Sequence, residues 1–192
     1  MGRSRTYADD AVVAGALDAF WRTGYETTAV PDLERATGLS RSSLYHAFGS
    51  KRGLFDAAVN AYLDGIVHPL LAPLRGESVP VDALDRYLTL MRTAMTDPAG
   101  RLAGHGCLLL NVATSPSVDD PTLGAVVRAY RDELAAAFAR GVAAAKPALD
   151  AEAADRLATA ITAQVIAAMT LVRVDPEGAA ALIDNARDML AA

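Results

Sequence analysis

The sequence is poor in the features that mark secreted and membrane proteins. Its 192 residues include a single cysteine, Cys107, so no intrachain disulfide can form, which fits a reducing compartment. No stretch reaches the roughly 18 to 20 unbroken apolar residues of a membrane helix. The N-terminal residues lack the continuous apolar core of a signal peptide. The composition therefore predicts a soluble, cytoplasmic protein.

Aromatic residues are also scarce, at 6% of the chain against a hydrophobic content of 52%. The apolar mass is largely Ala, Leu and Val, which favours closely packed helices over sheets rich in aromatic residues. The sequence shows neither the alternating pattern of strands nor an internal repeat. We therefore expect an all-α protein, long enough for one compact domain or two small ones.

Positive charge is limited, because the net charge is −5, but it is unevenly placed. Residues 1–53 carry seven Lys and Arg against six Asp and Glu, whereas residues 54–192 carry eleven against seventeen. The first part is therefore mildly basic and the second part is acidic. The basic first part is compatible with nucleic-acid binding, although the net negative charge of the whole chain argues against it.

Capping residues and the spacing of apolar residues predict nine helices. The first helix is expected to start near Thr6 and to end near Gly24. The third helix is expected to lie between Ser40 and Gly49. The prolines at 69, 73 and 80 predict a connector after the fourth helix, and residues 97–106 read as a loop. The expected helices cover about residues 6–24, 29–37, 41–48, 51–67, 81–96, 107–113, 121–145, 151–174 and 176–190.

The segment GLSRSSLYHAFGSK, residues 38–51, resembles the second helix of a helix-turn-helix. Leu44 and Phe48 can anchor a short helix, while polar side chains remain free on its outer face. Such a helix must enter a major groove about 12 Å wide, which explains its shortness and polarity. A solvated helix at a generic two-helix corner would show a similar pattern.

A longer segment makes the interpretation specific. TTAVPDLERATGLSRSSLYHAFGSKRGLF, Thr27 to Phe55, resembles the DNA-binding signature of the TetR family of bacterial repressors. The shared features are a Thr pair, an apolar-x-x-apolar helix, Gly-apolar-Ser at the turn, Leu-Tyr-x-x-Phe, and a Lys near the next helix start. Two positions depart from the pattern: Glu34 replaces a small residue, and Ala47 replaces a His, with His46 one place earlier.

The resemblance implies a three-helix DNA-binding head, residues 1–52, and a larger helical effector-binding and dimerisation domain, residues 53–192. It also implies a homodimer that represses transcription at double-stranded operator DNA until a small-molecule effector releases it. Arg3 and Arg5 are the only cations of the short N-terminal arm. The DNA-binding residues that it implies are Thr28, Arg41, Ser42, Ser43, Tyr45, His46 and Lys51, with Thr28 serving first as a helix cap.

Candidate residues for the second domain follow from its apolar pattern and from the resemblance. The acidic, Ala- and Leu-rich domain favours a neutral or cationic apolar effector. Candidate effector-binding residues are Leu63, Met91, Met95, Cys107, Asn111 and Tyr130. Apolar stripes on the last two helices suggest a four-helix dimer interface that contains Leu157, Ile161, Val165, Val172, Ile183 and Leu190.

Cys107 leaves two interpretations open. GCLLLN, residues 106–111, resembles a motif of a TetR subgroup in which some members sense electrophiles or oxidants, so Cys107 could be a reactive thiol. It could equally be a small buried residue in a pocket wall, as free cysteines often are. His105 and Cys107 alone do not make a zinc site. We expect no metal, cofactor or membrane partner. A ligand-independent adaptor or a helical enzyme with a DNA-binding head remains the alternative, although no catalytic set is evident.

Overall fold

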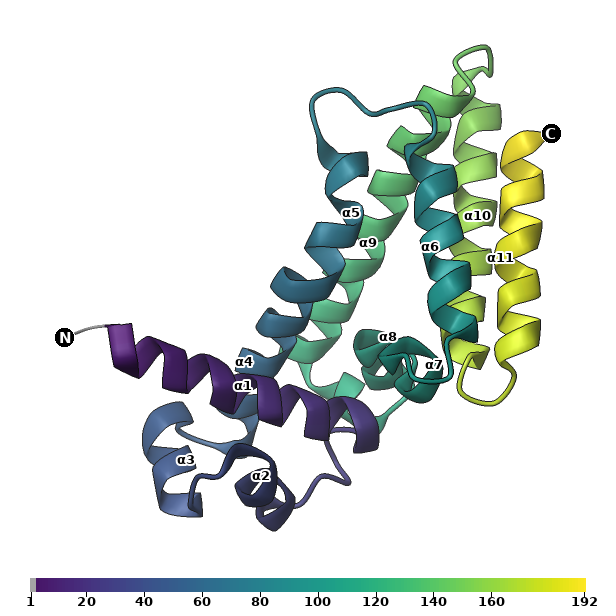
Figure 1. Cartoon of the computed structure of the whole chain (residues 1–192). Helices are drawn as coiled ribbons and strands as arrows, with labels where there is room; N and C mark the ends of the chain where they lie inside the picture. The colour runs from purple at the N-terminus through teal and green to yellow at the C-terminus, as the bar shows by residue number, and fades with distance from the viewer. Residues whose placement is uncertain (1–2) are drawn as a thin grey trace.

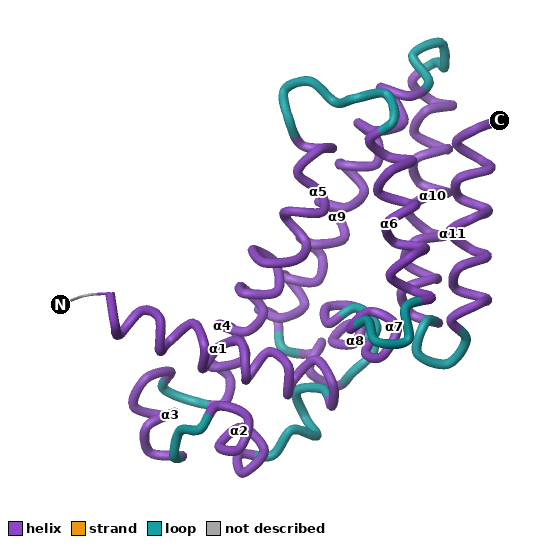
Figure 2. Tube along the Cα trace, in the orientation of Figure 1, coloured by secondary structure: helices purple, strands orange, loops and turns teal. Residues whose placement is uncertain are grey.

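The structure is a computed structural model that describes residues 3–192, with side chains from residue 10 onward. Every regular element within residues 3–192 is helical (Figure 1), as Figure 2 also shows, and this confirms the all-α class. The elements are α1 (Arg3–Thr23), α2 (Val30–Thr37), α3 (Arg41–Phe48), α4 (Lys51–Tyr62), η1 (Leu63–Val67), α5 (His68–Arg75), α6 (Ala83–Thr96), α7 (Arg101–His105), α8 (Leu108–Ala113), η2 (Pro116–Asp119), α9 (Pro121–Ala145), α10 (Ala151–Leu171) and α11 (Pro176–Ala191).

The first three helices form a small unit at one end of the molecule (Figure 1). α1 packs against both α2 and α4, and Phe20 and Leu17 on its inner face are buried. Gly38 ends α2 with φ of 71°, in the left-handed region that glycine adopts without strain. This turn sets α3 at an angle to α2. The predicted boundary between residues 52 and 53 falls in the first turn of α4 and stays a prediction.

α4, η1 and α5 form one continuous helix that crosses from this unit into the rest of the molecule (Figure 1). Its middle, Leu63–Val67, is a π turn in which the His68 N–H donates to the Leu63 carbonyl. Pro69 accounts for the wider turn. A proline ring inside an α-helix clashes with the carbonyl four residues earlier, here that of Gly65, and offers no N–H to it. The π turn moves that carbonyl aside, so the helix continues.

The sequence predictions differ from the structure in three places. The helix continues through Pro69 and Pro73 to Arg75, where a connector was predicted, because the π turn accommodates the first proline. The expected loop at 97–106 contains the short helix α7. The first helix begins at Arg3 rather than near Thr6; the side chains of Arg3, Arg5 and Thr6 lie outside the described residues.

The remaining helices form a bundle in which α10 lies between α9 and α11, and α6 packs against α11 (Figure 1). α5 also packs along α9. Gly141 of α9 permits this close approach. A Cβ at that position would stand 2.8 Å from both Leu74 Cδ2 on α5 and Leu84 Cβ on α6. Among the described helices none is both long enough and apolar enough to cross a membrane.

Candidate nucleic-acid interface and internal pocket

The outer face of α3 carries most of the polar side chains that the sequence singled out. Leu44 is buried and anchors the helix, whereas Arg41, Ser42, Ser43 and His46 are exposed. Tyr45 is half-buried beside them. The Arg41 guanidinium carbon lies 5.3 Å from the centroid of the Tyr45 ring, within the range of a cation–π contact. The structure thus brings these five side chains together on one short helix.

The N-terminus of α3 is fixed by two side chains. Ser40 is its N-cap, and its hydroxyl accepts a hydrogen bond from the Ser43 N–H at 3.3 Å. The Glu34 carboxylate, on α2, accepts the Arg41 N–H at 2.6 Å. Each bond satisfies an amide that has no partner within the helix. Glu34, which departs from the family pattern, therefore ties α2 to the start of α3.

Lys51 lies at the start of α4, near the C-terminal end of α3. Its ammonium group lies over the Tyr25 ring, 4.6 Å from the centroid, and 3.4 Å from the Glu26 carbonyl oxygen. Partial burial lowers the pKa of the Lys51 ammonium from its usual value. Its predicted phosphate contact stays a prediction.

Thr28 has a different place from the one predicted. Its side chain is only 1% exposed, and its hydroxyl donates to the Gly24 carbonyl oxygen and lies 2.7 Å from the Thr23 hydroxyl. The N-cap of α2 is Ala29, whose N–H donates to the Asp32 carboxylate. Thr28 therefore neither caps α2 nor offers a surface to DNA. It stabilises the loop between α1 and α2.

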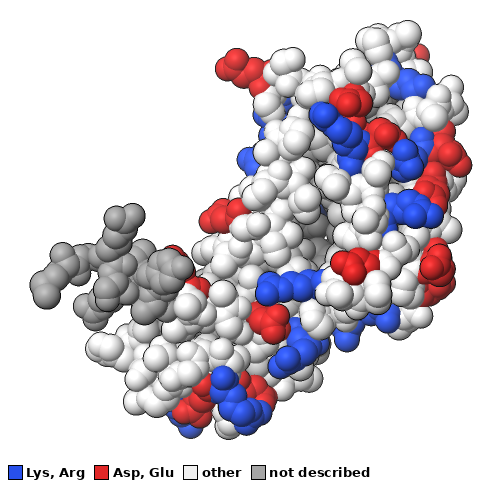
Figure 3. Space-filling view, in the orientation of Figure 1, with Lys and Arg blue, Asp and Glu red and all other residues white. Residues whose placement is uncertain are grey.

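The exposed charges of the head are mixed in sign. Figure 3 shows Lys or Arg and Asp or Glu side by side near α2, with few charges over α3 on this face. One such pair is Arg35 and Asp32 on α2. On this face of the head, Figure 3 therefore shows no continuous basic stripe. The contribution of α3 rests on the shape of the helix and on its individual side chains.

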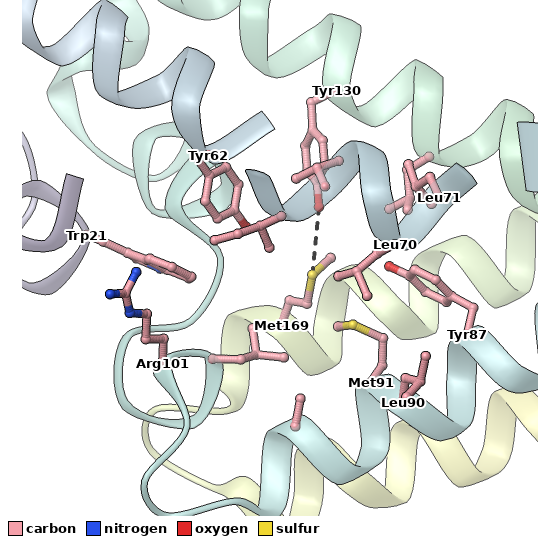
Figure 4. A pocket seen from close by; sticks show the side chains of 15 residues that line it. Trp21, Tyr62, Leu70, Leu71, Tyr87, Leu90, Met91, Arg101, Tyr130 and Met169 are labelled. Carbon is pink, nitrogen blue, oxygen red and sulfur yellow. Dashed lines mark hydrogen bonds between the residues drawn. The ribbon is translucent and has the colours of Figure 1, made fainter. Parts of the chain in front are cut away.

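A cavity of about 260 Å³ lies where the head meets the helical body. Its wall is drawn from α1, from the α4–α5 helix and from α6, α7, α9 and α10 (Figure 4). The lining is mostly apolar and includes Leu70, Leu71 and Met91. Trp21 and Arg101 lie next to each other at one side of the pocket (Figure 4), and the guanidinium carbon is 5.9 Å from the Trp21 ring centroid.

Three tyrosines give the wall its few polar atoms. The Tyr62 hydroxyl donates to Cys107 Sγ at 3.4 Å, the thiol lies 3.6 Å from the Tyr130 hydroxyl, and Tyr130 donates to Met169 Sδ at 3.8 Å. Figure 4 draws the last of these bonds. Burial raises the pKa of Tyr62, Tyr130 and Tyr87, so all three are neutral phenols at physiological pH.

The cavity contains only part of the predicted effector-binding set, which stays a prediction. Met91 and Tyr130 line the cavity, but Leu63 and Met95 do not. Cys107 is fully buried behind the tyrosine hydroxyls, outside the lining. The Asn111 amide donates to the His105 carbonyl oxygen at 2.8 Å, away from the cavity. The sequence analysis missed Trp21, Tyr62 and Arg101, which lie far apart along the chain and carry no shared motif.

Several contacts join the head and α4 to the body. The Trp21 indole N–H donates to the Gly106 carbonyl oxygen at 2.7 Å. Arg52, at the start of α4, lies 2.6 Å from the carboxylate of Asp120, the N-cap of α9. Ser117 donates to the Glu26 carboxylate. Burial acts to raise the pKa of Glu26, but the hydrogen bonds from Ser117, Ser115 and the backbone together outweigh it, so the net shift is downward.

The residues expected at a dimer interface are mostly internal. Ile161, Val165, Val172 and Ile183 have no exposed surface within one chain, and Leu190 is 6% exposed. They pack in the core of the bundle, so they cannot contact a second copy. Only Leu157 is half-buried. The periodic stripe identified the buried face of each helix, because the same spacing marks a core face and an interface.

A short polar helix set by a glycine turn on a helical body defines a helix-turn-helix DNA-binding protein. The family model described as "Bacterial regulatory proteins, tetR family" matches residues 12–58. The chain is 31% identical over 146 residues to the uncharacterized HTH-type transcriptional regulator YezE of Bacillus subtilis, covering 76% of this chain and 74% of YezE. It is 34% identical over 119 residues to the HTH-type transcriptional repressor ComR of Escherichia coli, covering 62% of this chain and 55% of ComR.

A solved structure of the TetR family regulator CifR, a cysteine mutant in complex with 26-bp operator DNA, aligns with a TM-score of 0.77. The identity is 25%, and the alignment covers 95% of each chain. This chain belongs to the TetR family of bacterial transcriptional regulators. Within the described residues, no group of three metal-ligating side chains occurs.

Proposed function

We propose that this protein is a cytoplasmic, homodimeric repressor that binds operator DNA through α3 and leaves it when a small molecule fills the cavity. The observation that carries the proposal is the position of Trp21. This residue belongs to α1 of the DNA-binding head, yet it lines the cavity and donates to the Gly106 carbonyl of the body. The head thus supplies part of the pocket that would control it. Regulation rather than catalysis is the activity that this arrangement serves.

The coupling follows from how α1 is held. α1 packs on α2 and on α4, so a shift of Trp21 moves the helix-turn-helix with it. Two recognition helices of a dimer must lie about one DNA turn apart, roughly 34 Å, to occupy successive major grooves. A ligand that binds a differently spaced dimer better draws the population away from DNA. Trp21 is part of the cavity wall and moves with the head. A bound ligand would therefore make different contacts at the two dimer spacings, as this mechanism requires.

The DNA-binding half of the proposal is tested by selecting operator fragments with the purified protein and placing them before a reporter gene. We expect the wild-type protein to lower reporter output and Arg41→Ala to relieve repression. Arg86→Ala is the matched control, because Arg86 is an exposed arginine on α6, away from α3. Equal repression by the wild type and the Arg41→Ala variant would remove α3 from the interface. Activation of the reporter would make the protein an activator instead.

A further inference from the structure

The charged and polar groups that line the cavity favour a ligand of one sign of charge. Among its described lining residues, Arg101 alone carries a formal charge, and no carboxylate is present. The three tyrosines are neutral phenols, and the hydroxyls of Tyr62 and Tyr130 already donate to Cys107 and Met169. The wall therefore offers the Arg101 guanidinium as a cationic donor to an entering molecule, and it has no acidic partner for a positively charged one.

Arg101 is placed to meet a ligand at the edge of the cavity. Its side chain is 55% exposed, and its one ion pair within the described residues, to Asp18 on α1, is loose at 3.8 Å. Figure 4 shows its guanidinium group beside the Trp21 ring, at the side of the pocket. The best aromatic surface for a cationic ligand is Trp21, and Arg101 already lies over that ring. A second cation there would be repelled.

We propose that the effector is an amphipathic monoanion, a small apolar body with one carboxylate, whose carboxylate binds Arg101 in place of Asp18. The cavity has room for an apolar body of roughly nine water-sized groups, since each occupies about 30 Å³. The inference rests on the proposed function for the pocket and names its ligand class. It differs from the neutral or cationic ligand suggested by the acidity of the whole domain, because the local charge of the cavity is positive.

The exchange of partners would also carry the signal. Asp18 lies on α1 of the head and Arg101 begins α7 of the body, so their ion pair spans the junction. A carboxylate that takes Arg101 from Asp18 removes one of the contacts that hold the head in place. The apolar body then lies against Trp21, the neighbouring head residue. Ligand binding and release of the head thus act through Trp21 and Asp18, which lie about one turn apart on α1.

Octanoate, octanol and octylamine test the charge preference, because they share a chain that fits the cavity and differ in the head group. The chain has one tryptophan, Trp21, so intrinsic fluorescence reports occupancy of the pocket directly. We expect octanoate to bind about tenfold more tightly than octanol, in line with a charge-assisted hydrogen bond, and octylamine to bind most weakly. Isothermal titration provides an independent measure of the same affinities.

Two variants should change the affinity for octanoate in opposite directions. Arg101→Gln is expected to make octanoate and octanol bind equally, and Asp18→Asn to tighten octanoate binding severalfold because Arg101 loses its competitor. Arg156→Gln is the control and should leave all three affinities unchanged. Tighter binding of octanol or octylamine, no binding of octanoate, or a carboxylate preference that survives Arg101→Gln would overturn the ligand class.

Release of DNA is measured separately, by fluorescence anisotropy of a labelled operator fragment. Octanoate that binds and releases the operator supports both the ligand class and the proposed function. Octanoate that binds without releasing DNA supports the ligand class and counts against the proposed control of DNA binding. Release by octanol or octylamine, with octanoate inactive, supports control by a ligand and overturns the monoanion. The two proposals therefore fail in different ways.

Discussion

At the scale of single residues, Cys107 shows how surroundings decide chemistry. It is fully buried, and the Tyr62 and Tyr130 hydroxyls lie within 3.6 Å of its sulfur. A sensor thiol needs access to its oxidant and a neighbouring cation that favours the thiolate. The phenols around Cys107 are neutral: the Tyr62 hydroxyl donates a weak hydrogen bond to the sulfur, and the Tyr130 hydroxyl oxygen accepts one from the thiol. This environment favours the structural interpretation of the two that the sequence leaves open.

We expect the Cys107 thiol of the folded protein to react with iodoacetamide at neutral pH at least about tenfold more slowly than free cysteine, because burial blocks access. In urea the rate should rise to that of the free amino acid. Mass spectrometry of quenched samples follows the reaction. Cys107→Ser should retain operator binding, whereas rapid alkylation accompanied by loss of DNA binding would identify an electrophile sensor.

At the scale of elements, α3 acts as a unit whose side chains support one another. Tyr45 is half-buried against the helix-turn-helix and holds the Arg41 guanidinium over its ring. Tyr45→Ala is expected to weaken operator binding by about 1–3 kcal/mol, through its own contacts and through the lost support for Arg41. Tyr45→Phe keeps the ring and should retain most of the affinity. Anisotropy titrations measure both, and equal losses would assign the effect to the hydroxyl.

Elements with local signals could be predicted from the sequence, and those set by distant contacts could not. α9 was predicted from Pro121 to about Ala145, its observed bounds, because Pro147 ends it; the structure adds Asp120 as its N-cap. The sequence predicted that this helix ends at residue 67, because prolines normally end helices. In the structure a π turn allows the α4–α5 helix to continue past Pro69. The short helix α7 was missed because five residues give no periodicity. The pocket was missed because its wall combines six helices from both halves of the chain.

At the scale of the whole molecule, Arg52 and Asp120 connect the first turn of α4 to the start of α9. The Arg52 hydrogen bond lowers the pKa of Asp120 below its usual value. A carboxyl group with a lowered pKa in the folded state stabilises that state above its unfolded pKa, about 3.9. That contribution is lost as the pH falls through the folded value.

Asp120→Asn should therefore lower the stability at neutral pH, and its difference from the wild type should shrink below about pH 4. Asparagine keeps the N-cap of α9, so the change removes mainly the ion pair. Urea unfolding across this pH range measures the effect. Asp150→Asn, at the N-cap of α10, is the control, since Asp150 has no ion pair with the described side chains. A difference that stays constant to pH 3 would contradict the assignment.

The dimer also belongs to this scale. Because the predicted apolar stripes are internal, we propose that a second copy uses the outward side of α10, where Thr159, Ala163 and Thr170 are exposed and Ala167 is half-buried. Side chains this small let two helices approach closely. We expect the wild-type protein to be a dimer by light scattering at micromolar concentration and Ala163→Asp to be a monomer. Ala14→Asp, on exposed α1, should remain a dimer. A dimeric Ala163→Asp variant would place the interface elsewhere.

The π turn of the α4–α5 helix links the length of the chain at that point to the presence of Pro69. A π turn holds about one residue more than an α turn between the same flanking segments. Removal of exposed Gly65, whose Cβ position is open, together with replacement of Pro69 would let the turn close as an α-helix while α4 and α5 keep their faces toward α1 and α9. Removal of Gly65 alone would leave Pro69 opposed to that closure. Homologues with an uninterrupted helix should therefore be one residue shorter here and lack a proline at this place, a pattern of paired deletion and substitution that an alignment can reveal.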